Sequence, residues 1–236
     1  MINKPIIKKP IPLIKKKYST NINDEINLLI EELNLSNLRL SKKELAKIYH
    51  KLSDLYIGAK NFNEAEKYLK KFIAIYPRNI ESNIALIYLF IANSQKNNAL
   101  NLTDNLLKSY PNNIEVLNNC ARVKTLCSLY DEAIAISKET LKIQSNNLNA
   151  LDNIQVCYAN KKNYEECIKY CYKTLDLDKN NINTLSRLSI ALLYVKNFDL
   201  TLEYLKKLEK LDPFNSTLRS LFPFLRNQLN LKSNIS

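Results

Sequence analysis

Three short stretches decide the fold: residues 76–79 read Tyr-Pro-Arg-Asn, residues 110–113 read Tyr-Pro-Asn-Asn, and residues 212–215 read Asp-Pro-Phe-Asn. The first two prolines are 34 residues apart, and the third lies three such periods after the second. Because proline cannot continue a helix, each stretch marks the end of a helical unit. A fixed period of this length predicts a tandem-repeat architecture.

Three further columns of residues follow the same period. One column is aromatic except for Lys96, one holds only small residues, and one begins each unit after the first with a branched aliphatic residue. Their members are Phe62, Tyr130, Tyr164 and Phe198; Ala65, Ala99, Ala133, Cys167 and Thr201; and Ile80, Ile114, Leu148 and Ile182. A small residue lets two helices approach closely where they cross. Within one unit, Leu151, Ile154 and Tyr158 recur at the three- and four-residue spacing of a helix.

This pattern resembles the tetratricopeptide repeat, with five units at residues 46–79, 80–113, 114–147, 148–181 and 182–215. The resemblance implies an all-α fold, an α-solenoid in which antiparallel helix pairs stack into a right-handed superhelix. The chain departs from the family's pattern because it lacks the usual tryptophan and the glycine of the first helix. The pentatricopeptide class, which reads RNA, favours one residue more per unit, so the gap-free spacing disfavours it.

The sequence also predicts a flank on each side of the repeats. The predicted parts are a basic extended arm at 1–20, an N-terminal capping helix and linker at 21–45, the repeats at 46–215, and a C-terminal capping helix and tail at 216–236. Ser41 and Glu44 have the spacing of a capping box, which predicts a helix start there. Caps are expected because a terminal repeat otherwise exposes its stacking face. Pro223 is a possible kink in the last helix.

The net charge of +12 is unevenly distributed along the chain. Six lysines fall within the first twenty residues with no acidic residue among them: Lys4, Lys8, Lys9, Lys15, Lys16 and Lys17. The arm has three readings: a solubilising tail, a localisation or docking element, and a contact to a membrane or a nucleic acid. The remaining positive charge is spread without a long basic block, which disfavours nucleic-acid binding but keeps it as the alternative function.

Gly58 is the only glycine in the chain. Phosphate-cradling loops, nucleophile elbows and two-residue hairpins all need glycine where the backbone turns sharply, so none is expected in its usual form. His50, Ser53 and Asp54 share a helix face, but neighbouring turns of one helix cannot place nucleophile, base and orienter around a substrate. We therefore expect no enzyme, no catalytic residue and no cofactor.

Five cysteines at irregular spacing indicate reduced thiols in a cytosol-like compartment. Cys157 lies in an apolar column and Cys167 in the small one, so packing is favoured over a metal site even though Cys171 is one helical turn away. No secretory signal is evident, and no apolar stretch of about eighteen residues could span a membrane. The sequence thus predicts a soluble cytoplasmic protein without a metal, with a nucleus or an organelle left open.

The resemblance also implies which residues meet a partner, because the first helix of each pair lines the concave wall of such a superhelix. Wall residues fall at the second, fifth, sixth, ninth and twelfth places of each unit. The candidate partner-binding residues at these places are Ile84, Tyr88, Ile91, Asn119, Arg122, Asn153, Val156, Ser186, Arg187 and Ile190. Asn119 and Asn153 resemble two rungs of the asparagine ladder in the O-linked N-acetylglucosamine transferase family, or they are ordinary solvated polar residues. The clamp that holds chaperone carboxylates is disfavoured because both of its lysines are missing.

These observations favour a non-catalytic scaffold or adaptor, such as an assembly factor or a co-chaperone-like protein. Its concave groove would bind a polypeptide segment of a partner through apolar anchors and shape. The alternative is a nucleic-acid-associated helical repeat that uses the basic arm. Nothing in the pattern specifies the partner, the pathway or the oligomeric state.

Overall fold

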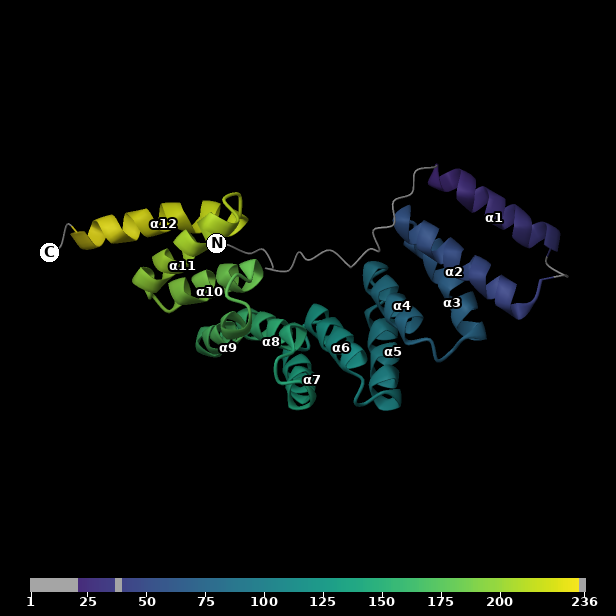
Figure 1. The fold of residues 1–236 in the computed structure, drawn as a ribbon, viewed down its shortest axis with the longest axis horizontal. Coiled ribbons are helices and arrows are strands. Elements are labelled where there is room, and N and C mark those ends of the chain that lie inside the picture. Colours follow the sequence, from purple (N-terminus) through teal and green to yellow (C-terminus); the bar gives the residue numbers. More distant parts are fainter. Residues whose placement is uncertain (1–20, 37–39, 234–236) are drawn as a thin grey trace. The chain divides into compact units, whose positions relative to one another are not determined.

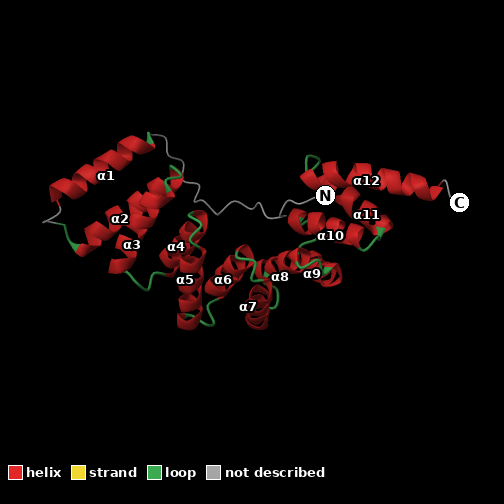
Figure 2. Cartoon of the chain, turned by 180° about the vertical axis from the view of Figure 1, so that it is seen from behind, coloured by secondary structure: helices red, strands yellow, loops and turns green. Residues whose placement is uncertain are grey.

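The computed structural model describes the backbone of residues 21–36 and 40–233, and the side chains of residues 21–34 and 40–225. The predicted basic arm at residues 1–20 lies outside the described residues. Within the described part there are twelve helices and no strand, so the predicted all-α fold is confirmed (Figure 1, Figure 2). The helices are α1 (Ile22–Ser36), α2 (Lys42–Gly58), α3 (Phe62–Ile75), α4 (Ile80–Ala92), α5 (Lys96–Ser109), α6 (Ile114–Leu126), α7 (Tyr130–Ile143), α8 (Leu148–Asn160), α9 (Tyr164–Leu177), α10 (Ile182–Tyr194), α11 (Phe198–Leu211) and α12 (Ser216–Ser233).

The chain divides into two compact units, with the boundary between Pro111 and Asn112. Unit 1 contains α1 to α5, in which α2 pairs with α3, α4 pairs with α5, and α1 packs against α2. Unit 2 contains α6 to α12, in which α6 pairs with α7, α8 with α9 and α10 with α11, while α12 packs against α10 and α11. Both units are therefore stacks of helix pairs, the arrangement expected of a helical repeat protein.

Each pair turns through a residue whose φ is positive although it is not glycine. These residues are Lys60, Ser94, Ser128, Lys162 and Lys196, with φ between 59° and 63°. In the first turn, the Lys60 amide donates to the carbonyl of Ile57 at 3.0 Å and the Asn61 amide donates to the carbonyl of Tyr56 at 2.9 Å. This is the usual ending of a helix at a left-handed residue, where glycine carries no steric cost. The rarity of glycine thus leaves the array with a small strain at every such turn.

Asparagines begin most of the helices, a role that the sequence interpretation missed. The side-chain oxygens of Asn79, Asn113, Asn147 and Asn181 accept from backbone amides in the first turns of α4, α6, α8 and α10. The distances from Asn79 to Ser82 and from Asn147 to Ala150 are both 2.8 Å. Ser41 and Glu44 form the predicted capping box at the start of α2. These contacts satisfy amides that a helix start leaves without a partner within the helix.

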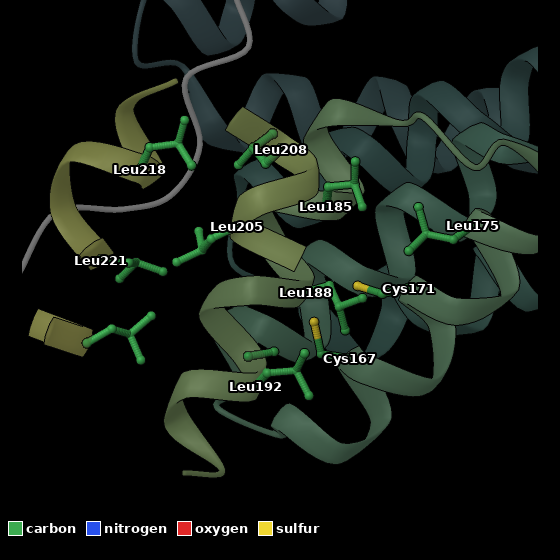
Figure 3. Packing of buried hydrophobic residues seen from close by; sticks show 12 residues of the cluster. Cys167, Cys171, Leu175, Leu185, Leu188, Leu192, Leu205, Leu208, Leu218 and Leu221 are labelled. Carbon is green, nitrogen blue, oxygen red and sulfur yellow. The ribbon is translucent and has the colours of Figure 1, made fainter. Parts of the chain in front are cut away.

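The column of small residues is buried at the crossing of each helix pair. Its five members are Ala65, Ala99, Ala133, Cys167 and Thr201, and all are fully buried. Around Cys167 and Cys171 of α9, leucines of α10, α11 and α12 close the core at the C-terminal end of unit 2 (Figure 3). Leu218, Leu221 and Leu225 join this cluster from α12, which runs through Pro223 without interruption. The last helix therefore covers the apolar end of the last pair, as a cap must.

Candidate functional site

The first helices of the pairs lie in a row in unit 2. Helix α8 contacts both α6 and α10, and α10 also contacts α12. We call α6, α8, α10 and α12 the inner row, and we call the side of it formed by the second, fifth, sixth, ninth and twelfth places of the repeats the inner face. Seven of the ten candidate residues lie in this row: Asn119, Arg122, Asn153, Val156, Ser186, Arg187 and Ile190. The inner row is where the structure brings most of the predicted site together.

The other three candidates, Ile84, Tyr88 and Ile91, lie on α4 of unit 1. Tyr88 is only 5% exposed and Ile84 is also buried, whereas Ile91 is half-buried. Substitution of Tyr88 or Ile84 therefore disturbs the packing of α4 as well as any contact to a partner. These positions are poor probes of binding, and the inner face of unit 2 provides better ones.

Apolar side chains follow the ninth place of the repeats along the inner row. Val156 on α8 and Ile190 on α10 are half-buried, and Phe224 on α12 continues the column with 46% of its surface exposed. Leu193, three residues after Ile190, is half-buried beside them in the twelfth place. The sequence interpretation missed Phe224 because the repeat register was ended at residue 215. One more step of 34 residues from Ile190 reaches Phe224, so the signal was present.

Arg187, in the sixth place of α10, is committed to contacts within unit 2. Its Nη1 donates to Gln155 Oε1 at 2.7 Å and to Asp152 Oδ1 at 3.1 Å. The side chain is 9% exposed. A buried guanidinium held by a carboxylate and an amide is already neutralised, so it offers little attraction to the carboxylate of a ligand.

Gln155 of α8 is the centre of the polar contacts around Arg187 and is fully buried. Its Nε2 donates to Thr174 Oγ1 at 2.6 Å and to the carbonyl of Tyr170 at 3.2 Å, both on α9. Its Oε1 also accepts from Thr184 Oγ1 of α10 at 3.4 Å. The amide of Gln155 thus joins three helices, α8, α9 and α10, beneath the inner face. Such a network stabilises the fold to the extent that its members are paired, and within the described residues Arg187 Nε is the one buried atom of this guanidinium left without a partner.

The two asparagines proposed as ladder rungs use an amide N–H within the chain. Asn119 Nδ2 donates to the carbonyl of Glu115 at 2.9 Å, and Asn153 Nδ2 donates to the carbonyl of Asn118 at 3.2 Å. Asn153 is buried, and its contact joins α8 to α6. Ser186, in the fifth place of α10, donates to the carbonyl of Ile182 at 2.9 Å. These polar groups therefore stabilise the inner row.

The residues considered for catalysis lie on α2 in unfavourable positions for it. Ser53 is buried, and its hydroxyl donates to the backbone carbonyl of His50 at 2.7 Å instead of to the imidazole. His50 Nδ1 lies 3.3 Å from Asp54 Oδ2. A serine that faces the backbone of its own helix is not positioned as a nucleophile.

The cysteines of unit 2 are buried free thiols. Burial raises the pKa of the Cys157 thiol to about 11, and the contact of its sulfur with Thr125 Oγ1 at 3.1 Å offsets this only in part. A thiol with so high a pKa is a weak nucleophile at neutral pH. Over residues 21–34 and 40–225, no group of three metal-binding side chains is gathered in one place. Among the helices described, none combines the length and the apolar character needed to cross a membrane.

Comparison with known proteins agrees with this architecture. The family model of the tetratricopeptide repeat matches residues 46–79, which are the bounds of the first predicted unit. Among solved structures, PilF of Pseudomonas aeruginosa is similar with a TM-score of 0.66 and 19% identity, covering 81% of this chain and 87% of that one. MamA from Desulfovibrio magneticus gives a TM-score of 0.63 and 18% identity, covering 73% and 98%. The thermophilic repeat protein TTC0263 of Thermus thermophilus gives 0.59 and 13%, covering 76% and 98%. A comparison with curated proteins finds no match.

Stacked helix pairs with a period of 34 residues define an α-helical repeat protein. The first repeat unit matches the model of the tetratricopeptide repeat, and the chain shares its fold with the solved structures named above. Stacked repeats of this kind present an extended surface on which another protein can bind.

Proposed function

We propose that the chain is a non-catalytic scaffold that binds a polypeptide segment of a partner protein along the inner face of unit 2. The observation that carries the proposal is the apolar column Val156, Ile190 and Phe224, which passes over three neighbouring helices of the inner row. Successive helices in such a row are about 10 Å apart, which is close to the rise of seven residues of an α-helix. An amphipathic helix with apolar residues at that spacing would fit the column.

The charges of the inner face support a partner segment that is apolar instead of acidic. Arg187 is paired with the carboxylate of Asp152 and donates a hydrogen bond to Gln155, so it adds no open positive charge at the centre of the face. Asn119 and Asn153, which make hydrogen bonds within the inner row, place uncharged polar side chains beside the apolar column. Affinity would then come from a few apolar anchors, with the polar groups setting orientation.

The test uses positions whose replacement should spare the core. Val156 and Phe224 are not among the residues packed against the buried cluster of unit 2, unlike Ile190 and Leu193. The variants Val156→Lys and Phe224→Lys should lower recovery of a specific partner from native lysate by at least about tenfold, the effect of losing one anchor. Circular dichroism should show unchanged helix content and thermal midpoint.

Two outcomes would contradict this proposal. Recovery of the same partners by the wild type and by both variants would remove the inner face as the binding surface. Recovery of nucleic acid in place of protein, lost as salt rises from about 50 to about 200 mM, would favour the alternative function of a nucleic-acid-associated repeat. The variant Lys138→Glu on α7 serves as the control, because Lys138 is exposed and lies on a second helix of a pair, away from the inner row.

A further inference from the structure

A second apolar surface of unit 2 lies at the turns between successive helix pairs, away from the inner face. Six large apolar side chains flank these turns with exposed fractions between 38% and 81%. They are Ile143, Leu148, Leu177, Ile182, Leu211 and Phe214, which we call the turn ridge. Single exposed apolar side chains are ordinary on a protein surface, but a contiguous exposed set marks an interaction surface.

The topology makes these side chains one continuous row. Ile143 ends α7 and Leu148 begins α8, so one turn joins them, and the next turn joins Leu177 to Ile182 in the same way. Within an antiparallel pair, the start of the first helix lies beside the end of the second. Leu148 therefore lies beside Leu177 across the α8–α9 pair, and Ile182 lies beside Leu211 across the α10–α11 pair. The six side chains thus follow one another across the three turns between helix pairs of unit 2: each turn joins two of them, and each helix pair brings one turn beside the next.

Phe214 is the clearest sign that the ridge is not required by the fold. At the same place of the other repeats the chain carries Arg78, Asn112, Asn146 and Asn180, which are ordinary turn residues. Phe214 is 81% exposed, so its ring contributes almost nothing to the core. Its exposed ring is therefore available to a partner.

The size and charge of the ridge fit a second copy of the same chain. From typical side-chain areas, the six residues expose roughly 400–600 Å² of apolar surface, a large part of the about 800 Å² that each partner buries in a stable interface. The charged residues directly beside them in the sequence are mixed in sign: Lys142, Asp176, Asp178, Lys210 and Asp212. A row of mixed sign repels itself less than a row of one sign, and at the middle turn Lys179 directly follows the acidic Asp178.

We propose that the turn ridge is a homodimer interface in which two copies pair about a two-fold axis at the middle turn, residues 177–182. In a two-fold pairing each surface meets its own copy, so the first turn of one chain faces the third turn of the other. This brings Ile143 and Leu148 to Leu211 and Phe214, and it places Lys142 opposite Asp212. The distance between neighbouring turns is the same in both copies, because both carry the same repeat period.

The first test is sedimentation equilibrium of the full chain from about 1 to about 200 µM. The wild type is expected to change from monomer to dimer, and Phe214→Asn, which restores the residue of the equivalent turns, should weaken dimerisation at least about tenfold. Leu177→Lys at the middle turn should abolish it. Phe224→Lys on the inner face is the matched control and should leave dimerisation unchanged, so failure of this proposal is distinct from failure of the proposed function.

Cysteine crosslinking tests the two-fold arrangement itself. The five native thiols are buried, so an added exposed cysteine reacts without competition from them. Asn180→Cys, near the axis, should form a disulfide-linked dimer on mild oxidation, and a mixture of Asn146→Cys and Phe214→Cys chains should crosslink to each other. A wild type that stays monomeric at about 200 µM, or Asn180→Cys that crosslinks no faster than Lys173→Cys on α9, would overturn the proposal.

Discussion

Units 1 and 2 are built from the same repeat but join their repeats differently. In unit 2, α8 contacts α6 and α10 directly, whereas in unit 1 no Cα atom of α2 lies within 8 Å of one in α4. The distance between packed helices depends on the size of their side chains, and α4 buries the aromatic residues Tyr88 and Phe90, while α6 buries the small residues Cys120 and Ala121. The period of the repeat is thus the same in both units, but the direct contact between successive first helices is not.

The polar contacts that join repeats also differ between the units. In unit 1, Glu66 of α3 accepts from Asn93 Nδ2 and Gln95 Nε2, both at 2.9 Å, and so holds the turn between α4 and α5. In unit 2, the amide of Gln155 lies in the core between α8, α9 and α10. Glu66 is a buried carboxylate whose two amide donors are half-buried beside a turn, whereas Gln155 is a fully buried neutral amide. Substitutions of Glu66 and of Gln155 should therefore lower the free energy of unfolding by different amounts.

The largest expected effect is that of Gln155→Met, which keeps the volume of the side chain but removes its amide. Arg187 then loses its 2.7 Å acceptor while it remains buried, and the carbonyl of Tyr170 loses a donor. We expect a loss of about 2–4 kcal/mol in the free energy of unfolding, because a buried charged donor and a buried carbonyl lose a partner together while Asp152 still pairs with Arg187. Urea denaturation followed by circular dichroism measures it.

The control for that loss is Gln155→Glu, which keeps acceptor oxygens for Arg187 and Thr184. It should cost less than Gln155→Met, because the buried guanidinium remains paired. Equal losses for the two variants would show that packing of the side chain, and not the bond to Arg187, makes Gln155 important.

An intermediate effect is expected for Glu66→Ala in unit 1. Three donors lose their acceptor, namely Asn93, Gln95 and Lys70, the last at 2.6 Å. The three donors are half-buried or exposed and regain bonds to water, so we expect a loss of about 1–3 kcal/mol, smaller than for Gln155. A loss as large as that of Gln155→Met would contradict the distinction between donors that water can reach and donors that it cannot.

The stability of unit 1 should also depend on pH through Glu66. Burial raises the pKa of this carboxyl, but the bonds from Lys70, Asn93 and Gln95 outweigh burial, so its pKa lies below the ordinary value of 4.5. A lowered pKa gives stability that is fully present above the pKa of the unfolded chain and is lost as pH falls through that of the folded chain. The difference in urea midpoint between wild type and Glu66→Gln should therefore shrink below pH 4.5. A constant difference down to pH about 3 would contradict it.

The sequence predicted the repeating parts of the molecule but not the contacts between repeats. Proline, aromatic and small columns located the helices, because each requirement recurs at the same place in every unit. The bond from Gln155 to Arg187 joins residues far apart in the sequence whose types occur at those places in no other unit. The burial of Tyr88 likewise depends on how α4 meets its neighbours, so helical register alone gave its side of the helix and not its exposure. The periodicity of the sequence predicts the helices that all repeats share, and it does not predict the contacts that only one repeat makes.

The smallest expected effect tests the feature that the two units share. Lys60 in unit 1 and Lys162 in unit 2 both have φ of 59°, a conformation that costs a side chain energy but costs glycine nothing. Lys60→Gly and Lys162→Gly should each raise the free energy of unfolding by about 0.5–1 kcal/mol, reduced in part by the greater freedom of glycine in the unfolded chain. Gly58→Ala is the matched control, because the added Cβ meets no atom within 4 Å and alanine favours the helix. If the gain appeared in one unit only, the turns would not be equivalent, and the difference between the units would extend to the backbone of the repeat itself.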